Sequence, residues 1–312
     1  MRTRRRYAYS IVALLIAFLS TAVFGQTSAY TPGSPILMWK VSSKTNSAYL
    51  LGSVHIWDKS MYPLPAVVEK AFAASNTLIV EVDVTKVDHQ QLQQLVMGAG
   101  MFPAGDDLTQ HITAATRAKL NEFTAGYGVP PDAFFKYRPW MVGLTVVMLP
   151  MLKAGMDPEN GMDMYFLHKA GDKHVEQLED AAFQIKLFAS FPDKNADHTI
   201  LHAMEQAKES NAMLAKLATY WSHGEAAKID ELMASMSADD DADEKVLSRR
   251  LREDRNPHMT ERLEKCLQSG EKCFMVVGAA HTVGSEGIVK QLQAHGYRVE
   301  QAVVETSAKA AQ

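Results

Sequence analysis

The sequence lacks most of the motifs that identify common enzyme classes. Among its 312 residues there is no G-x-S-x-G elbow, no P-loop and no G-x-G-x-x-G turn, which disfavours a serine-hydrolase mechanism and nucleotide chemistry. With two cysteines the chain cannot form a disulfide-rich scaffold, and their spacing is not that of C-x-x-C redox chemistry. No apolar run reaches the roughly 20 residues that a membrane-spanning helix needs. The function must be read from sparser signals.

The N-terminus, over residues 1–25, has the pattern of a signal peptide. Arg2, Arg4, Arg5 and Arg6 precede an apolar stretch over residues 11–24 that is too short to span a bilayer. Small residues follow, and cleavage after Gly25 or after Ala29 fits the usual pattern. We therefore expect an exported mature chain of residues 26–312; the alternative is an uncleaved anchor.

Charge and cysteine placement restrict the partners and the compartment. Without the four leading arginines, 28 basic side chains face 36 acidic ones, a mature charge of about −8. This balance argues against nucleic acid as a partner, because phosphate binding needs a basic surface. Cys266 and Cys273 lie seven residues apart across a turn that contains Gly270. In an oxidising compartment they can form a local disulfide or stay free.

Periodicity predicts an α/β fold: a central mixed β-sheet flanked by helices. The β-prone runs 36–42 and 48–54 read as a hairpin, a helix begins after Pro63-Leu64-Pro65, and 77–84 returns to strand. This β-helix-β order is typical of parallel strands. The C-terminal part of the chain repeats the order with a strand, a helix and a strand over 273–277, 286–295 and 297–304.

The middle of the chain reads as a large helical insertion over about 85–270. Helices are expected over 108–126, 132–154 and 161–170, then a short strand over 174–178. From 195 to about 270 the pattern is helical, with breaks near Gly224 and Ser237-Ala238. Because the units at the two ends can share one sheet, we expect residues 26–312 to form a single domain.

Two G-x-x-H segments are the most informative feature. An apolar run of strand character precedes each, at Gly52-x-x-His55 and at Gly278-x-x-His281. A glycine lets a backbone or a ligand approach closely, and histidine is the commonest metal ligand. Two such histidines at two strand ends predict two sides of one site.

Acidic residues follow two other strands of the predicted sheet. Glu81 and Asp83 share one face of the strand over 77–84, and Glu179 ends the strand over 174–178. A carboxylate in an apolar strand is costly unless it is paired, hydrogen-bonded or metal-bound. The plainer interpretations are a helix-capping or arginine-paired acid for Glu81 and a helix-dipole acid for Glu179. Asp83 and Asp163 read as capping and helix-start acids.

Three further patterns carry less weight. Arg255 lies in a charged segment and on spacing alone reads as a surface residue. Asp239, Asp241 and Asp243 have calcium-loop spacing, but the turn glycine and the final glutamate of that motif are missing. His198 and His202 are four apart on a predicted helix, yet Thr199 stands where a zinc protease has its glutamate. We therefore do not expect a metal site there.

The segments above resemble the TraB/PrgY/GumN family, which includes the animal Tiki proteases. In chain order the matching segments are LGSVH at 51–55, YPLP at 62–65, LIVEVD at 78–83, GMD at 161–163, QLE at 177–179, Gln184, Arg255-Asn256 with Met259, VGAAH at 277–281, Gly284 and GYRV at 296–299. They cover about residues 35–304. The exported form is similar to the GumN branch of Gram-negative bacteria, which implies a periplasmic location.

The resemblance implies a fold like the erythromycin-esterase/ChaN group, with a central sheet and two related halves. It also implies a divalent-metal-dependent hydrolase whose metal ligands are His55, His281 and Glu81. On this basis Glu81, Glu179 and Arg255 are the expected catalytic residues. Ser53 departs mildly from the family pattern, which commonly has a β-branched residue there.

Two functional hypotheses follow. The first is a periplasmic metal-dependent hydrolase, most simply a peptidase acting on a peptide or protein, that uses Mn, Co, Fe or Zn. The second is a non-catalytic periplasmic protein that sequesters a peptide, a metal or haem, or assists exopolysaccharide assembly. The sequence does not indicate an oligomeric state.

Overall fold

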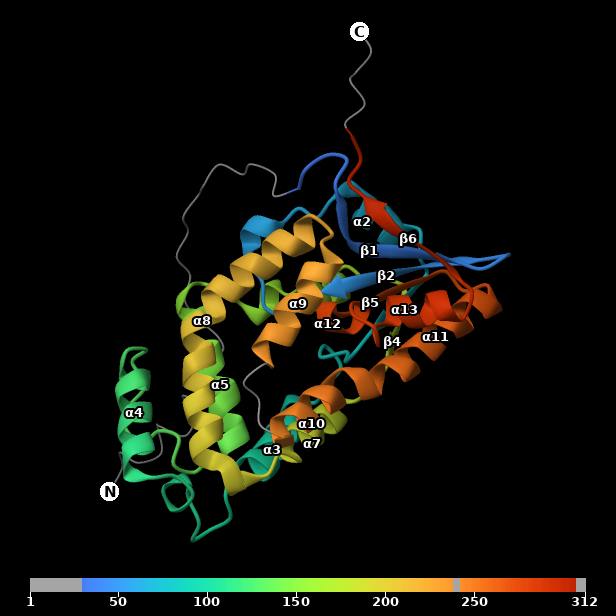
Figure 1. Cartoon of the computed structure of the whole chain (residues 1–312). Coiled ribbons are helices and arrows are strands. Elements are labelled where there is room, and N and C mark those ends of the chain that lie inside the picture. The colour runs from blue at the N-terminus through green and yellow to red at the C-terminus, as the bar shows by residue number, and fades with distance from the viewer. Residues whose placement is uncertain (1–29, 238–241, 307–312) are drawn as a thin grey trace.

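A computed structural model describes residues 30–237 and 242–306 of the chain (Figure 1). The predicted signal peptide at residues 1–25 lies outside these described residues. Within them, a β-sheet packs among helices at one end of the molecule, and a group of long helices extends from it (Figure 1). The fold is mixed α/β, as the sequence predicted, with a central mixed sheet flanked by helices. The relation between two halves stays a prediction.

The sheet has six strands in the order β4-β3-β5-β2-β1-β6. The strands are β1 Pro35–Ser42, β2 Ser47–Ser53, β3 Thr77–Val80, β4 His174–Gln177, β5 Cys273–Gly278 and β6 Arg298–Val303. β4, β3, β5 and β2 pair in parallel, whereas β1 is antiparallel to both β2 and β6. All residues of β3 and β5 are buried, as expected for central parallel strands covered on both faces.

The predicted hairpin and the predicted parallel orientation of the strands are both confirmed. However, β2 and β3 are not neighbours, because β5 from the end of the chain lies between them and pairs with both. The two ends of the chain thus interleave in one sheet. The two strands that precede the G-x-x-H histidines, β2 and β5, therefore lie side by side, and Gly52 pairs with Val277.

Each face of the sheet is covered by its own helices. Phe72 of α2 (Ala66–Ala73) and Phe166 of α6 (Met162–His168) both contact Phe274 of β5 on one face. The preceding residue of β5, Cys273, points to the other face, because side chains alternate along a strand. There it forms a disulfide with Cys266 of α11 (Asn256–Ser269). The disulfide that the sequence left open is therefore present.

The remaining elements complete the chain. Beside the sheet lie α9 Ala226–Met236, α12 Ala279–Thr282 and α13 Ile288–Ala294. The helical region contains α3 His89–Gly100, α4 Ala114–Ala125, α5 Pro139–Lys153, α7 Ala181–Ala189, α8 Ala196–Ser222 and α10 Ala242–Leu251. Short 3₁₀ turns are η1 Lys59–Met61, η2 Leu108–Gln110, η3 Pro158–Asn160, η4 Asp193–Asn195 and η5 Glu253–Arg255.

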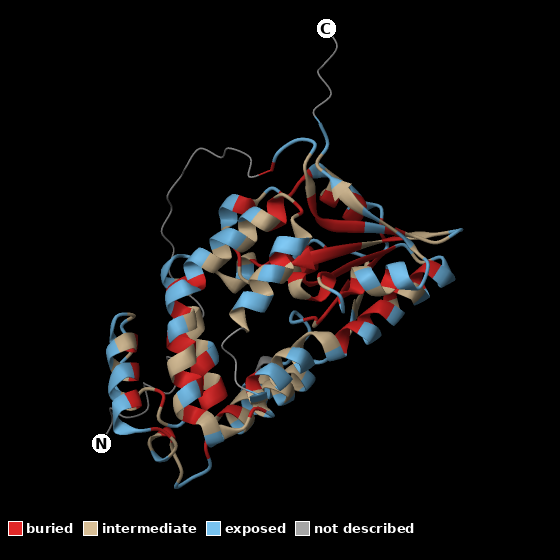
Figure 2. Cartoon of the chain, viewed as in Figure 1, coloured by how far each residue is buried: buried red, intermediate tan, exposed pale blue. Residues whose placement is uncertain are grey.

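The helical region has an apolar core of its own. Buried side chains of α4, α5 and the first half of α8 pack together there, whereas the sheet belongs to a separate, larger core (Figure 2). α8 reaches both: Ile200 lies in the helical core and Trp221 in the sheet core. Trp221 also donates a hydrogen bond to the carbonyl of Gly52 at 2.5 Å. None of the helices in the described ranges is both long and apolar enough to cross a membrane.

Some element limits differ from the sequence prediction. The helix expected over 132–154 begins at Pro139. Asp132 has a φ of 63°, which a right-handed helix cannot contain, and Arg138 before the proline is extended with a ψ of 153°. The strand expected over 77–84 ends at Val80, so Glu81 and Asp83 lie beyond it rather than on one strand face. α3 was not predicted.

Candidate active site

Four neighbouring parallel strands each deliver one polar side chain to the same edge of the sheet. Glu179 follows β4, Glu81 follows β3, His281 follows β5 and His55 follows β2. Ligands of open α/β sheets bind outside the carboxyl ends of parallel strands. The order of the strands therefore brings these four residues, distant in sequence, to the position where that architecture forms sites.

His55 is held by an aspartate from a helix start. Its Nδ1 lies 2.7 Å from Asp163 Oδ2, and Ser53 donates to the other oxygen of Asp163 at 3.1 Å. Its Nε2 faces Glu81 Oε1 at 3.7 Å. The Asp163 carboxylate raises the pKa of His55 to about 9, and the side chain is 57% exposed. Asp163 thus fixes the ring so that Nε2 points toward Glu81.

The segment around Asp163 packs directly on the backbone of the first G-x-x-H motif. Met162 donates its N–H to the carbonyl of Val54 at 3.1 Å. A Cβ on Gly161 would approach the His55 carbonyl oxygen to 2.3 Å, so only glycine permits this contact. Asp163 does begin helix α6, as expected, but its side chain also serves the site.

His281 is held in the same way by an amide. Its Nδ1 lies 2.7 Å from Asn256 Oδ1, and Asn256 Nδ2 donates to the Glu286 carbonyl at 2.7 Å, which fixes the amide orientation. The Nε2 of His281 lies 3.1 Å from Arg255 Nη1 and 3.8 Å from Glu81 Oε2. Burial lowers the pKa of His281 to about 4. The ring is neutral at neutral pH, with its proton on Nδ1 and a lone pair on Nε2.

Glu81 lies between the two histidines. Its Oε1 accepts the N–H of Gly278 at 2.6 Å, and its Oε2 accepts from Arg255 at 2.5 Å. Burial alone would raise the pKa of the carboxyl, but the two histidines and Arg255 hold it at about 2. Glu81 is therefore a buried carboxylate that stays ionised.

Arg255 joins the two glutamates. Its Nε and Nη2 bind Glu179 bidentately at 2.7 and 2.6 Å, and Nη1 donates to the Leu251 carbonyl at 2.6 Å. Gln184 reaches Glu179 at 3.2 Å and Glu81 at 3.4 Å. The interpretation of Arg255 as a surface residue is wrong, because its side chain is 8% exposed.

Gly278 leaves the room in which these side chains meet. A Cβ at this position would lie 3.0 Å from His55 Nε2, 3.3 Å from Glu81 Oε1 and 3.6 Å from the His281 ring. A side chain would therefore fill the space between the two histidines and the glutamate. The glycine of the second G-x-x-H motif is thus explained by the site itself.

The donor set fits a divalent ion. Each histidine presents Nε2 toward Glu81 while a hydrogen bond anchors its Nδ1, which is the usual arrangement of metal-ligating histidines. His55, whose pKa is about 9, must release its Nε2 proton when it binds an ion. Both Nε2 atoms lie within about 4 Å of a Glu81 oxygen. Two ligands of one ion can be that far apart when each metal–ligand bond is near 2.1 Å. However, no choice of one ligand atom from each of the three residues brings all three within 4.8 Å of one another. For all three to bind one ion, Arg255 must give up its bond to His281.

A hollow of about 500 Å³ lies next to this edge of the sheet, between α3 and α7. It is lined by Asp83, Lys86, Val87, Asp88, Gln91, Leu92, Leu95, Val175, Gln177, Asp180, Ala181 and Ala182. Asp83 lies two residues after Glu81, and Asp180 directly follows Glu179. None of the four strand-end side chains lines the hollow itself.

The structure brings together every residue that the sequence assigned to the site. Glu179 and Glu81 are also joined through the backbone, where the Glu179 N–H donates to the Glu81 carbonyl at 2.9 Å. Asp83 only caps its own loop, through Thr85 and Lys86.

Two positioning residues escaped the sequence interpretation. Asp163 read only as a helix-start acid, and Asn256 was noted beside Arg255 without a role. Each anchors a histidine from a distant part of the sequence, where no local spacing rule operates. The only signal for them was their place within segments that resemble the family.

Comparison with known proteins agrees with these motifs. The model of the TraB/PrgY/gumN family matches residues 37–301, which contain all four strand-end side chains. The chain belongs to this family. It is 27% identical over 179 residues to the uncharacterized protein YbaP of Shigella flexneri and over 178 residues to YbaP of Escherichia coli K12.

The alignments with YbaP are partial. They cover 56% and 55% of this TraB/PrgY/gumN chain, and 63% of each relative's length. No solved structure matches the chain. The comparisons thus give the family, and the chemistry must be argued from the site.

Proposed function

We propose that this TraB/PrgY/gumN protein is an exported, periplasmic, divalent-metal-dependent hydrolase that cleaves peptide bonds. The observation that supports it is the meeting of two anchored histidines at one buried glutamate, with both Nε2 atoms turned toward the carboxylate. The peptide substrate class rests on the resemblance to the Tiki proteases. The periplasmic location rests on the signal pattern of residues 1–25.

In this proposal His55, His281 and Glu81 hold the ion, which is Mn, Co, Fe or Zn. When bound, such an ion lowers the pKa of a water molecule and polarises a carbonyl group. Asp163 and Asn256 keep the two rings in place and fix which nitrogen faces the ion.

The remaining residues move a proton and stabilise charge. Glu179 takes a proton from the attacking water as its oxygen bonds to the carbonyl carbon, and returns it to the amine nitrogen as the C–N bond breaks. Arg255, once released from His281, donates to the oxygen that becomes negative during the attack. Its bonds to Glu179 keep the guanidinium in the site throughout.

One observation favours the alternative of a binding protein without turnover. In the structure Arg255 bonds Glu81, Glu179 and the Nε2 of His281 at once, so catalysis by an ion at this site requires Arg255 to leave His281 first. A protein that only sequesters a ligand has no need to release this arginine. Catalytic turnover of a peptide distinguishes the hydrolase from the binding protein.

The test is a peptide-library cleavage assay on metal-loaded protein, paired with elemental analysis. We expect cleavage to stop with chelator, and His55→Ala, His281→Ala and Glu81→Gln each to lose at least a hundredfold in rate, about 3 kcal/mol of transition-state stabilisation. The matched control is His168→Ala/His295→Ala, two exposed histidines away from the site. Unchanged cleavage and metal content in His55→Ala or His281→Ala would refute the hydrolase; metal binding without cleavage in the wild type favours the binding protein.

A further inference from the structure

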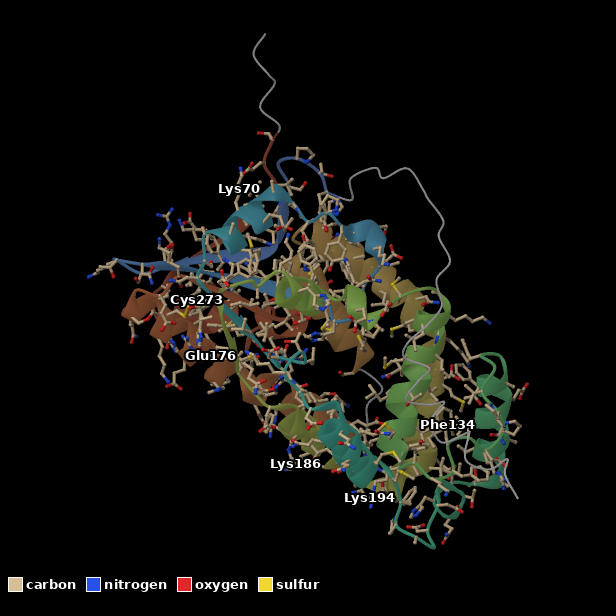
Figure 3. The ribbon with its side chains drawn as sticks, turned by 180° about the vertical axis from the view of Figure 1, so that it is seen from behind. Lys70, Phe134, Glu176, Lys186, Lys194 and Cys273 are labelled. Carbon is tan, nitrogen blue, oxygen red and sulfur yellow. A yellow bond between two sulfur atoms is a disulfide. The ribbon has the colours of Figure 1, made fainter. Side chains whose placement is uncertain are left out.

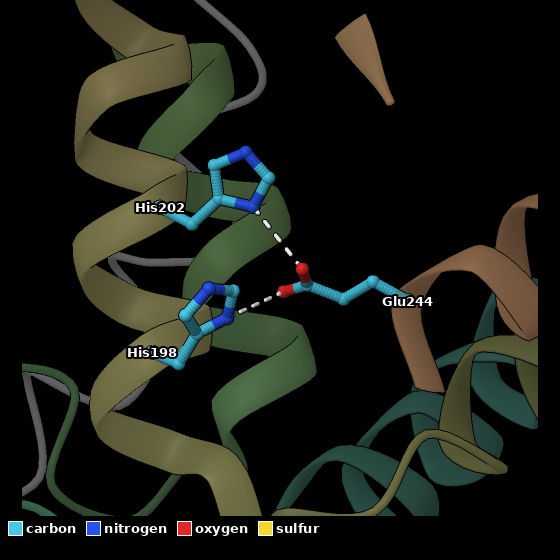
Figure 4. A group of neighbouring side chains, drawn as sticks. All are labelled: His198, His202 and Glu244. Carbon is cyan, nitrogen blue, oxygen red and sulfur yellow. Dashed lines mark hydrogen bonds and ion pairs between the residues drawn. The ribbon is translucent and has the colours of Figure 1, made fainter. Parts of the chain in front are cut away.

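A second pair of histidines faces a glutamate in the helical region. His198 and His202 lie one turn apart on α8, so their rings share one face of the helix. Glu244 of α10 points between them from the opposite side (Figure 4). The helical spacing alone did not predict a metal site, because the third residue belongs to another helix much further along the chain.

The two histidines contact the glutamate at equal distances. Glu244 Oε1 lies 3.3 Å from His198 Nδ1, and Glu244 Oε2 lies 3.3 Å from His202 Nδ1. The Glu244 side chain is 10% exposed, and that of His202 is 15% exposed. A carboxylate this deeply buried needs charged or hydrogen-bonding partners, and here imidazole nitrogens face both of its oxygens.

These distances suit a tetrahedral ion. One ligand atom from each of the three residues can be chosen so that all lie within 4.8 Å of one another. Metal–ligand bonds of about 2.0–2.1 Å place neighbouring ligands of a tetrahedral ion about 3.3 Å apart, and each of the two nitrogens lies at that distance from a different oxygen of the carboxylate. The sheet-edge residues do not meet this criterion. The His198 side chain is 45% exposed, so an ion and a completing water can enter from solvent.

A nearby amide can set the protonation of His202. Gln206 Nε2 lies 3.3 Å from His202 Nε2. In this orientation the amide donates to Nε2, and the ring proton lies on Nδ1, toward Glu244. The same Gln206 Nε2 also donates to the Met236 carbonyl at 3.4 Å. Flipping the amide gives up that bond and turns its oxygen to the Nε2 of His202, which then carries the proton, so that the lone pair of Nδ1 can bind an ion.

We propose that His198, His202 and Glu244 form a second site for a divalent transition-metal ion, separate from the sheet edge, that ties α8 to α10. Two imidazoles and a carboxylate suit Zn²⁺, Co²⁺, Ni²⁺ or Cu²⁺, whereas Mg²⁺ and Ca²⁺ prefer sites made of oxygens. The site is structural: it crosslinks two helices that these ion pairs already bring into contact. α10 leads directly into η5, which carries Arg255, so the crosslink also steadies the segment that enters the sheet-edge site.

The test uses the full mature chain with His55→Ala/His281→Ala as the background, so that the sheet edge cannot contribute these ligands. In that background, His198→Ala/His202→Ala is compared with the matched control His168→Ala/His295→Ala. Each protein is stripped with chelator, dialysed against Zn²⁺ and analysed for zinc. We expect one zinc ion per chain in the control and none in the test variant.

Two further measurements follow the same pair of proteins. Added Co²⁺ should give the intense visible absorption of a tetrahedral site in the control alone. Zn²⁺ at a hundredfold excess over Kd should raise the control's Tm by about 5 °C and leave that of the test variant unchanged.

Equal zinc content in the test and control proteins would overturn the proposal and leave the cluster as ion pairs only. If the double substitution fails to fold in chelator, as judged by circular dichroism, Glu244→Gln takes its place, because the amide keeps the shape and removes the charge. Since the background lacks both sheet-edge histidines, the outcome does not depend on whether the proposed hydrolase is correct.

Discussion

The chain places two histidines against a glutamate twice, and the two clusters are built in different ways. At the sheet edge the residues come from separate strands, and other side chains fix each ring: Asp163 for His55 and Asn256 for His281. Between α8 and α10, two histidines one helical turn apart share one glutamate, and a glutamine is the neighbour of one ring.

The difference teaches how the supporting residues indicate a role. A site for chemistry needs side chains held to within a fraction of an ångström, which demands a second layer of hydrogen bonds. A metal site that only joins two helices also needs its ligand rings oriented, but it has no reacting substrate to position. We therefore expect substitutions of the supporting residues to matter at the sheet edge and to matter less between the helices.

The largest effect should come from Arg255→Met. The change leaves the buried carboxylates of Glu81 and Glu179 without their cation. We therefore expect the free energy of unfolding to fall by about 3–5 kcal/mol. Urea denaturation of metal-free protein measures this. At the other cluster Glu244→Gln should cost about 1 kcal/mol, because it removes one hydrogen-bonded carboxylate. Equal losses of stability in Arg255→Met and Glu244→Gln would contradict the difference between the two clusters.

The disulfide should be next in size. Cys266 and Cys273 join α11 to the first residue of β5, at the end of that strand away from the site, and the helical region has no such crosslink among its described residues (Figure 3). Closing so short a loop stabilises by about 2–3 kcal/mol. The free energy of unfolding of Cys266→Ser/Cys273→Ser should be lower by that amount, and reductant should lower that of the wild type similarly. If reductant leaves the stability of the wild type unchanged, packing alone holds α11 against β5.

A smaller effect should follow from loosening one histidine. Asp163→Asn keeps the shape of the side chain but removes the charge that anchors His55, so we expect metal affinity and cleavage to fall about 10–100-fold. Competition with a chelator dye measures the affinity. Gln206→Ala, the corresponding change between the helices, should leave cleavage at the sheet edge unaltered. If Asp163→Asn binds metal normally, Asp163 serves only α6.

The smallest effect is a dependence of stability on pH at the outermost strand, β4. Arg262 of α11 binds Glu176 of β4 bidentately at 2.7 and 2.6 Å and holds the pKa of that carboxyl below its usual range (Figure 3). Because the folded pKa is depressed, the stabilisation is present above the unfolded pKa and is lost as pH falls through the folded one. We expect about 1 kcal/mol or less, since the Glu176 side chain is 31% exposed.

Arg262→Met removes this ion pair together with the one that Arg262 makes to Glu271 at 2.9 Å. Unfolding in urea at several pH values should show a smaller loss of stability on acidification for Arg262→Met than for the wild type. Parallel pH profiles for the two proteins would contradict a role of Glu176.

The sequence by itself determined the family, the order of elements within each end of the chain and the four strand-end residues of the sheet-edge site. Those features follow from local patterns, because an apolar run followed by a glycine or an acid marks the end of a strand. His55, Glu81, Glu179 and His281 could be named for this reason. The resemblance then raised Arg255 above a surface interpretation.

Only the tertiary structure decided how those residues are held together. That β5 lies between β2 and β3, that Asp163 and Asn256 anchor the rings, and that Glu244 reaches the histidines of α8 all depend on contacts between distant parts of the chain. Local periodicity carries no information on such contacts, because they are selected by the packing of whole elements against one another. The sequence therefore indicates which residues stand at the ends of strands, and the packing decides which of them meet.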